Sequence, residues 1–173
     1  MAERTCMEAA LSKLNYRMRS KAELVSSLRE LGYEEDEISD TIAELETFGY
    51  VNDRRFSEEF IRSSSRKNWS SSRMMRSLRE KGISSELAKE AIDSFFEDSE
   101  GETSGSYDRK KALETGLKMA EEQFRKGKEA DEKFMGRVGR RLVTLGYDSS
   151  TCYYVIGVLR KKTKQHEEEE EFF

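Results

Sequence analysis

Residues 24–45, LVSSLRELGYEEDEISDTIAEL, contain the pattern that decides the fold of this chain. Leu24 and Leu28 precede Gly32 at a spacing of four, and further apolar residues follow the glycine at spacings of three and four. Such spacings place side chains on one face of a helix. The stretch therefore predicts two amphipathic helices joined by a tight turn at Gly32.

The same pattern occurs twice more, at offsets of 50 and 64 residues, with no gap inside any copy. The copies are Leu24, Leu28, Gly32, Tyr33, Ile38, Thr41, Ile42 and Leu45; Met74, Leu78, Gly82, Ile83, Ala88, Ala91, Ile92 and Phe95; and Val138, Leu142, Gly146, Tyr147, Cys152, Val155, Ile156 and Leu159. Periods of this size are typical of repeat proteins, whose small units bury their apolar faces by stacking. Each glycine fits the left-handed position after a helix, followed by the apolar residue of a Schellman ending.

A further helix is expected before each pair, and Ser20 with Glu23 predicts a capping box at the start of the helix that contains Leu24. The apolar faces of these preceding helices are Met7, Leu11, Leu14 and Met18; Phe56 and Phe60, after the capping residues Asn52 and Asp53; and Leu113, Leu117, Ala120 and Phe124. The sequence thus predicts an all-α fold of three tandem three-helix repeats that form an elongated, curved array.

The expected repeats occupy residues 1–48, 49–97 and 107–164. Between the second and third, residues 98–106 are expected to form a flexible acidic linker, because the stretch is rich in Gly, Ser and acids. Residues 165–173 contain five successive glutamates. These repel one another, which predicts a solvated acidic tail beyond the last helix.

Composition restricts the class of protein. Charged residues make up 38% of the chain, proline is absent and the mean hydropathy is −0.86. No apolar stretch is long enough to span a bilayer, so a soluble cytoplasmic protein is expected. Cys6 and Cys152 fall on apolar helical positions and are interpreted as buried thiols, with a disulfide between them as the less favoured alternative.

The residues needed for catalysis are missing. His166 is the only histidine and borders the acidic tail, and two separated cysteines with one histidine do not make a zinc site. Gly136 and Gly139 lack the Gly-Lys-Ser/Thr ending of a phosphate-binding loop and are interpreted as positions of close helix approach. We therefore predict no enzyme activity, no catalytic, cofactor-binding or metal-binding residue, and no cofactor.

Charge is segregated along the chain. Residues 32–53 carry eight acids and no base, whereas residues 54–82 carry nine bases and three acids. Clusters of one sign favour a charged partner such as a polyanion or an acidic protein. The candidate contact surface consists of Arg62, Arg66, Lys67, Arg73, Arg76, Arg79 and Lys81, near Trp69, together with a second group, Lys133, Arg137, Arg140 and Arg141. For any single residue, a solvated helical face is an equally good interpretation.

Residues 45–92, LETFGYVNDRRFSEEFIRSSSRKNWSSSRMMRSLREKGISSELAKEAI, resemble the signature of the RecX regulatory proteins. The resemblance rests on Phe48, Gly49, Tyr50, Val51, Asn52, Asp53, Phe56, Leu78, Lys81, Gly82 and Ile83. Flanking copies extend it to residues from about 5 to 162.

The resemblance implies a helical protein that lies along the groove of the RecA filament on DNA. It implies inhibition of ATP-driven strand exchange and coprotease activity, or promotion of filament disassembly. The expected partner is thus the RecA filament, with weak direct contact to DNA, no membrane and a monomeric chain. The basic surface would bridge neighbouring RecA protomers through Arg62, Arg66, Arg73, Arg76, Arg137 and Arg140.

Two alternatives stay open. A helix pair with a glycine turn also describes a helix-turn-helix module, so the chain could be an array that binds DNA directly. Against this alternative, the helix that would enter the groove is acidic in the first two copies, and acids repel phosphate. A scaffold that binds some other protein is the second alternative.

Overall fold

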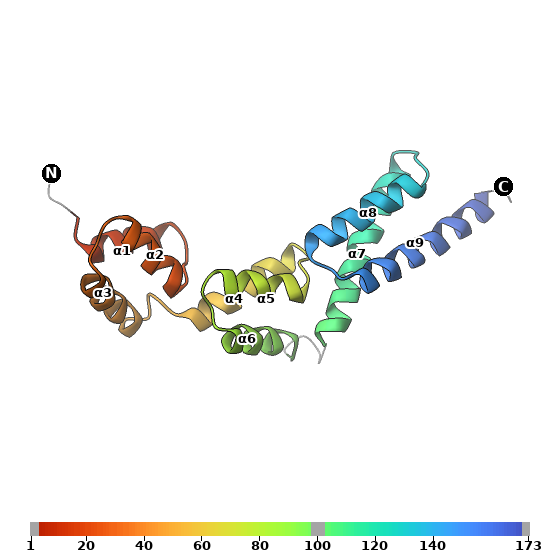
Figure 1. Ribbon diagram of the computed structural model, residues 1–173. Helices are drawn as coiled ribbons and strands as arrows, with labels where there is room; N and C mark the ends of the chain where they lie inside the picture. Colours follow the sequence, from red (N-terminus) through yellow and green to blue (C-terminus); the bar gives the residue numbers. More distant parts are fainter. Residues whose placement is uncertain (1–3, 98–102, 171–173) are drawn as a thin grey trace. The chain divides into compact units, whose positions relative to one another are not determined.

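The computed structural model describes residues 4–97 and 103–170, with residues 164–170 described through their backbone alone. Within these residues the chain forms nine α-helices and no strand (Figure 1), which confirms the all-α prediction. The helices are α1 (Cys6–Tyr16), α2 (Lys21–Glu30), α3 (Glu35–Thr47), α4 (Asp53–Arg66), α5 (Ser71–Glu80), α6 (Ser85–Glu97), α7 (Ser104–Arg125), α8 (Glu132–Leu145) and α9 (Ser149–Glu170).

The chain divides into two compact units. The first comprises Met1–Arg62 with Met75–Ile92, and the second comprises Ser63–Met74 with Asp93–Phe173. Helices α4, α5 and α6 therefore each contribute residues to both units. The repeat bounds at residues 48 and 97 stay a prediction, since the units are divided at other positions.

The three repeated glycines end their helices as the sequence predicts. Gly32, Gly82 and Gly146 have φ values of +89°, +78° and +93°, in the left-handed region. In each copy the N–H of the apolar residue after the glycine donates to a carbonyl five residues earlier, as from Ile83 to Leu78 at 3.1 Å. These bonds satisfy carbonyls at the helix end, so the pair of helices turns sharply.

Each unit has its own apolar core. The core of α1, α2 and α3 contains Cys6, Ala9, Ala10, Leu24, Leu28, Ile38, Ile42, Leu45 and Val51. The core around α7, α8 and α9 contains Ala112, Ala120, Ala130, Phe134, Met135, Val138, Leu142, Leu145, Tyr147, Cys152, Val155 and Leu159. Both cysteines are buried and free, which confirms their interpretation as buried thiols.

The predicted faces of α1 and α7 are slightly rotated from the observed ones. In α1 the most buried positions are Cys6, Ala9 and Ala10, and the larger side chains of Met7 and Leu11 pack at the edge of the core. Small residues permit the closer helix approach, and periodicity that counts only large apolar residues misses them. Met18 follows the end of α1 and is 38% exposed, so its assignment to this face is wrong.

A recurrent contact joins each copy to the next inside the units. In the first unit the fully buried Ser20 hydroxyl donates to the Lys81 carbonyl at 2.5 Å. In the second unit the equivalent Ser70, 50 residues later, donates to the Gly146 carbonyl at 2.7 Å. Each serine also caps its own helix, since its oxygen accepts the N–H three residues on. One buried hydroxyl thus starts a helix and holds the glycine turn of the following copy.

Two predicted boundaries need correction. Residues 103–106 belong to the start of α7 rather than to a linker, because Thr103 and Ser106 form a capping box; residues 98–102 lie outside the described residues. The acidic segment is not wholly beyond the last helix, because the backbone of α9 continues to Glu170. Each residue added to a helix gains a backbone hydrogen bond, and here this gain outweighs the repulsion between neighbouring glutamates.

Candidate protein-interaction surface

The predicted basic cluster of residues 62–81 is divided between the two units. Arg62, Arg76, Arg79 and Lys81 belong to the first unit. The other three cations, in residues 63–74, belong to the second. The structure therefore supports two basic surfaces, one in each unit, in place of a single cluster.

In the first unit, two of the four cations are held by acids. Arg62 pairs with Glu59 at 2.8 Å, one turn away on α4. Lys81 pairs with Glu23 at 2.8 Å, and its ammonium lies 5.8 Å from the centroid of the Phe60 ring. Lys81 therefore stabilises the junction between copies, and this explains its presence without a binding role.

Of the four predicted contact residues in the first unit, Arg76 and Arg79, on α5, are the two that no acid holds. Both are exposed, and neither forms an ion pair or hydrogen bond with another side chain in the part of the chain that is described. Exposed arginines have five donors each that can bind carboxylates or phosphates. These two residues are the best candidates for contact in this unit.

In the second unit, a turn between α4 and α5 is fixed by the third copy. Asn68 has φ +56°, a left-handed conformation that asparagine tolerates. Its side-chain amide donates to the Thr115 hydroxyl at 3.0 Å, and its carbonyl accepts from the Tyr147 hydroxyl at 2.8 Å. Burial raises the pKa of Tyr147, so this donor keeps its proton. The turn is thus a preformed part of the surface.

Trp69 and Arg73 extend this fixed turn. The Arg73 guanidinium lies 3.8 Å from the centroid of the Trp69 ring and donates to the Thr144 carbonyl. Trp69 itself packs against the core of the second unit. Arg73 therefore has a structural role that a purely solvated arginine would not have.

The start of α5 is fixed by a partly buried carboxylate. Asp108, on α7, accepts the Ser71 N–H at 2.8 Å and the Ser71 hydroxyl at 2.7 Å. Burial raises the pKa of Asp108, and the two hydrogen bonds from Ser71 oppose this effect. The carboxylate lies at the positive end of the helix dipole, where negative charge is favoured.

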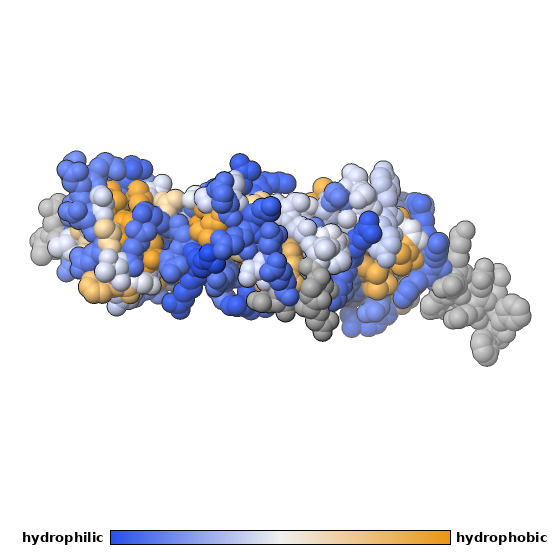
Figure 2. Space-filling view, turned by 90° about the horizontal axis from the view of Figure 1, so that it is seen from below, coloured by the Kyte–Doolittle hydropathy of each residue, from blue (hydrophilic) through white to orange (hydrophobic). Residues whose placement is uncertain are grey.

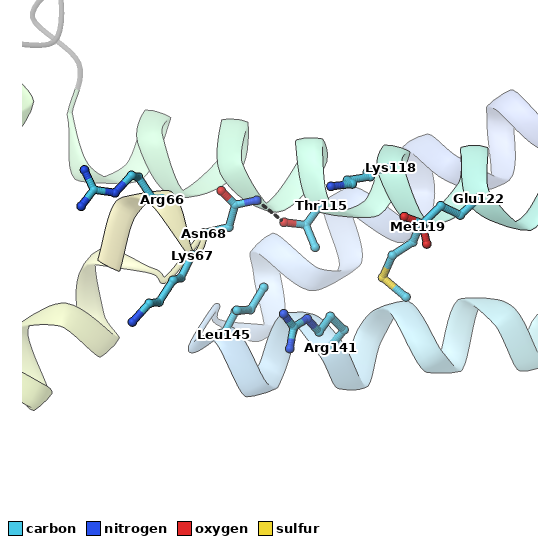
Figure 3. A pocket seen from close by; sticks show the side chains of 9 residues that line it. All are labelled: Arg66, Lys67, Asn68, Thr115, Lys118, Met119, Glu122, Arg141 and Leu145. Atoms are coloured by element: carbon cyan, nitrogen blue, oxygen red, sulfur yellow. Dashed lines mark hydrogen bonds between the residues drawn. The ribbon is translucent and has the colours of Figure 1, made fainter. Parts of the chain in front are cut away.

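Beside the turn lies a cavity of about 340 Å³ that we call the basic pocket (Figure 3). Its residues come from the end of α4 and the following turn, from α7 and from α8. Figure 3 shows Met119 extending from α7 towards α8 and Arg141 lying between these helices. The lining residues are Arg66, Lys67, Asn68, Thr115, Lys118, Met119, Glu122, Arg141 and Leu145.

The basic pocket joins residues of both predicted groups. Arg66 and Lys67 come from the first group, and Arg141 comes from the second. Lys118 is a fourth cation that the sequence did not single out, because it lies on a helix outside both groups. No spacing rule connects α7 to the turn after α4, so only the packed fold identifies it.

The rest of the second group lies along α8. Arg137 donates to the Gln123 side chain at 3.0 Å, and its guanidinium is 5.6 Å from the centroid of the Phe134 ring. Lys133 and Arg140 are exposed. Of these three residues, one arginine is held against the fold and the other two cations are open to solvent.

The described residues offer no site for catalysis by a metal. No group of three His, Cys, Asp or Glu residues in residues 4–97 and 103–170 could hold a metal ion. Nor does any described helix combine the length and the apolar character needed to cross a bilayer. In Figure 2 hydrophilic residues cover most of the visible face, and hydrophobic residues show only in separate patches. The face shown in Figure 2 is thus mostly hydrophilic.

Two family descriptions match this chain. Residues 6–45 match the first three-helix domain of RecX, and residues 52–92 match its second three-helix domain. These ranges correspond to α1–α3 and to α4 with α5 and most of α6.

Several curated relatives have the name regulatory protein RecX. The protein of Clostridium perfringens (strain 13 / Type A) is 27% identical over 154 residues, covering 87% of this chain and 66% of its own length. That of Corynebacterium efficiens is 30% identical over 104 residues, covering 60% of this chain and 50% of its own length. The chain thus spans between half and two thirds of the length of these relatives.

Solved structures share the fold. The crystal structure of RecX from Lactobacillus salivarius has a TM-score of 0.65 at 23% identity, covering 90% of this chain and 94% of that one. A second crystal structure, of a regulatory protein RecX, has a TM-score of 0.64 at 18% identity. With both three-helix domains, the named relatives and the shared fold in agreement, this chain is a member of the RecX family.

Proposed function

We propose that this chain binds the RecA recombinase filament and restrains its ATP-driven strand exchange and its coprotease activity. The observation that carries the proposal is the match of residues 6–45 and 52–92 to the two RecX domains, whose named relatives are regulatory proteins. In this proposal the chain acts by binding and not by catalysis, as a cytoplasmic monomer without a cofactor. Direct contact with DNA is weak.

The exposed cations of both units support contact with an acidic protein surface. Arg76 and Arg79 in the first unit, and Lys133 and Arg140 in the second, are open to solvent. Opposite charges on two partners speed association and fix the register of the complex. A protein that contacts neighbouring RecA protomers through such residues would resist the movements that accompany ATP hydrolysis.

The test is DNA-dependent ATP hydrolysis by RecA of the same organism, titrated with this protein below stoichiometric ratio. Binding to naked DNA is measured in parallel. Inhibition well below the concentration that occupies DNA is the expected result. Inhibition only in step with DNA occupancy would instead favour the array that binds DNA directly, whose affinity falls steeply with salt because phosphate contacts release counterions.

A further inference from the structure

The basic pocket contains charge that the fold does not use. Lys118 and Arg141 are exposed at its rim, and neither forms an ion pair or hydrogen bond with another described side chain. Arg66 and Lys67 add two further cations, against one carboxylate, Glu122. Lys118 and Arg141 carry like charges at one cavity and repel each other, so an anionic ligand that binds both would relieve a cost that the free protein bears.

The interior of the pocket is partly apolar. Leu145 is 3% exposed and Met119 packs against the same core, so both present fixed apolar atoms to the cavity. The polar wall is also fixed, because Asn68 is bonded to Thr115. A volume of about 340 Å³ is near the lower end of the range of roughly 300–1,000 Å³ for ligand pockets. The cavity thus suits a short segment with both charge and an apolar side chain.

We propose that the basic pocket binds an acidic segment of a partner protein, with carboxylates on Lys118 and Arg141 and one apolar side chain against Met119 and Leu145. Arginine binds carboxylates through two parallel hydrogen bonds, which gives both affinity and orientation. The proposal rests on the proposed function, because it takes the partner to be a protein.

A nucleic acid fits the surroundings of the pocket less well. Glu122 lines the cavity, and Glu114 and Glu121 are exposed on the same helix. A phosphate backbone carries charge at every nucleotide and would meet these carboxylates along α7, whereas a peptide places its acids only at chosen positions. The apolar side chains of Met119 and Leu145 also offer no hydrogen-bond donor to a phosphate group.

The protein contains its own reporter for this pocket. Trp69 is the only tryptophan of the chain. The ammonium of Lys67, a lining residue, lies 5.8 Å from the centroid of its ring. Carboxylates bound at Lys118 and Arg141 would bring negative charge into the pocket that Lys67 also lines, which would weaken this cation–π contact and change the tryptophan fluorescence.

The experiment titrates the full chain with a capped peptide, Glu-Glu-Leu-Glu-Glu, and follows the fluorescence of Trp69. Two matched peptides replace either the four glutamates by glutamine or the leucine by glycine. Inorganic phosphate and a single-stranded oligothymidine are the other probes. Saturable binding of the first peptide is expected, with each matched peptide at least tenfold weaker, and phosphate and oligothymidine weaker still.

Two variants with the same change of net charge complete the experiment. Lys118→Glu with Arg141→Glu should weaken the peptide at least tenfold. Arg125→Glu with Lys126→Glu, exposed at the end of α7 and outside the pocket, should leave it unchanged. Circular dichroism checks that both variants stay folded.

Equal loss in both variants, equal binding of the glutamine peptide, or tighter binding of oligothymidine or phosphate would overturn the proposal. The RecA assay separates it from the proposed function. If the wild-type protein inhibits RecA but does not bind the peptide, the proposal for the basic pocket is wrong and the proposed function stands. Peptide binding that depends on Lys118 and Arg141, in a protein that never inhibits RecA, would overturn the proposed function alone.

Discussion

Among single residues, Glu23 on α2 links the segments that directly follow α1 and α5 in the first unit. Its carboxylate accepts from Arg17 at 3.0 Å and from Lys81 at 2.8 Å, and it also completes the capping box of α2. Burial alone would raise its pKa, but the hydrogen bonds and charges of Arg17 and Lys81 lower the pKa of Glu23 to about 2, from an ordinary 4.5. The ionised form is therefore a stabilising element of the folded chain.

Glu23→Gln should make the free energy of unfolding less dependent on pH in the acidic range. Because the pKa of Glu23 is lower in the folded state, its contribution is fully present above pH 4.5 and is lost as the pH falls towards 2. At pH 7 the wild type should exceed the variant by about 1–2 kcal/mol in free energy of unfolding, because solvent screens part of the interaction, and the difference should close in that window. Urea unfolding of the two proteins at several pH values measures the difference at pH 7 and its decrease at low pH.

The control for this prediction is Glu46→Gln. Glu46 also forms an ion pair, with Lys21 at 2.9 Å, but its side chain is 42% exposed. Exposed pairs contribute roughly 0–1 kcal/mol. A difference between wild type and Glu23→Gln that persists unchanged at pH 2 would contradict the electrostatic account and assign the effect to packing.

At the scale of the turn between helices, Gly82 has two separate reasons to be glycine. Its φ of +78° disfavours any side chain, and a Cβ there would lie 2.2 Å from the Cβ of Ala22. Gly32 has the same kind of φ but no atom within 4 Å of a built Cβ. Gly32→Ala should therefore cost about 1–2 kcal/mol from the backbone alone. Gly82→Ala should cost about 1–3 kcal/mol more, from overpacking.

A double variant isolates the junction contact. Ala22→Gly removes the atom that Gly82→Ala would meet, so the two changes together should be less destabilising than the sum of the single ones. Thermal or urea unfolding of the four proteins gives this interaction free energy. Strict additivity would mean that the two copies move apart and that the junction is not tightly packed.

Helix packing in the second unit predicts opposite effects for two glycines. Gly116, buried in α7, would place a Cβ 2.6 Å from Val155 Cγ1 on α9, whereas Gly157, exposed in α9, has no atom within 4 Å. Gly157→Ala should stabilise the chain by roughly 0.5–1 kcal/mol through helix propensity. Gly116→Ala should destabilise it by about 1–3 kcal/mol. Equal stabilisation in urea unfolding would show that α9 shifts freely.

The sequence predicts a structural feature well when the interactions that form it involve residues close together in the chain. Gly32, Gly82 and Gly146 were found because a helix end is decided within a few residues. The close approach expected at Gly136 and Gly139 involves only ordinary contacts, whereas Gly116, which the sequence did not single out, is tightly packed inside its helix. Likewise Thr103 and Ser106 cap α7 inside a stretch whose composition resembles a linker. The spacing of residues in the sequence does not predict which distant segments line one pocket, as Lys118 and Arg141 do.

At the scale of the whole molecule, charge is the feature that most directly concerns a partner. Residues 32–53 are acidic and residues 54–82 are basic, but the structure uses part of this charge internally. Arg73, Lys81 and Arg137 contact rings, carbonyls or acids of the fold. The cations that can reach a partner are therefore fewer than the sequence alone suggests.

Under the proposed function, reversal of exposed cations in both units should weaken inhibition of the RecA filament. We expect the concentration for half-inhibition of RecA ATP hydrolysis to rise at least tenfold, because like charges at the contact repel and slow association. The variant combines Arg76→Glu, Arg79→Glu, Lys133→Glu and Arg140→Glu. Its control reverses four other exposed cations, Arg125→Glu, Lys126→Glu, Lys161→Glu and Lys162→Glu.

The control has the same net charge, so it separates a specific surface from a general electrostatic effect. Loss of inhibition in both proteins would mean that net charge, and not these residues, governs association. Electrostatic steering by net charge is screened by salt, over a Debye length of about 10 Å at 0.1 M. Unchanged inhibition by the first variant would place the contact elsewhere. Loss in the first variant alone, still present at moderate salt, would assign the contact to the exposed cations of α5 and α8.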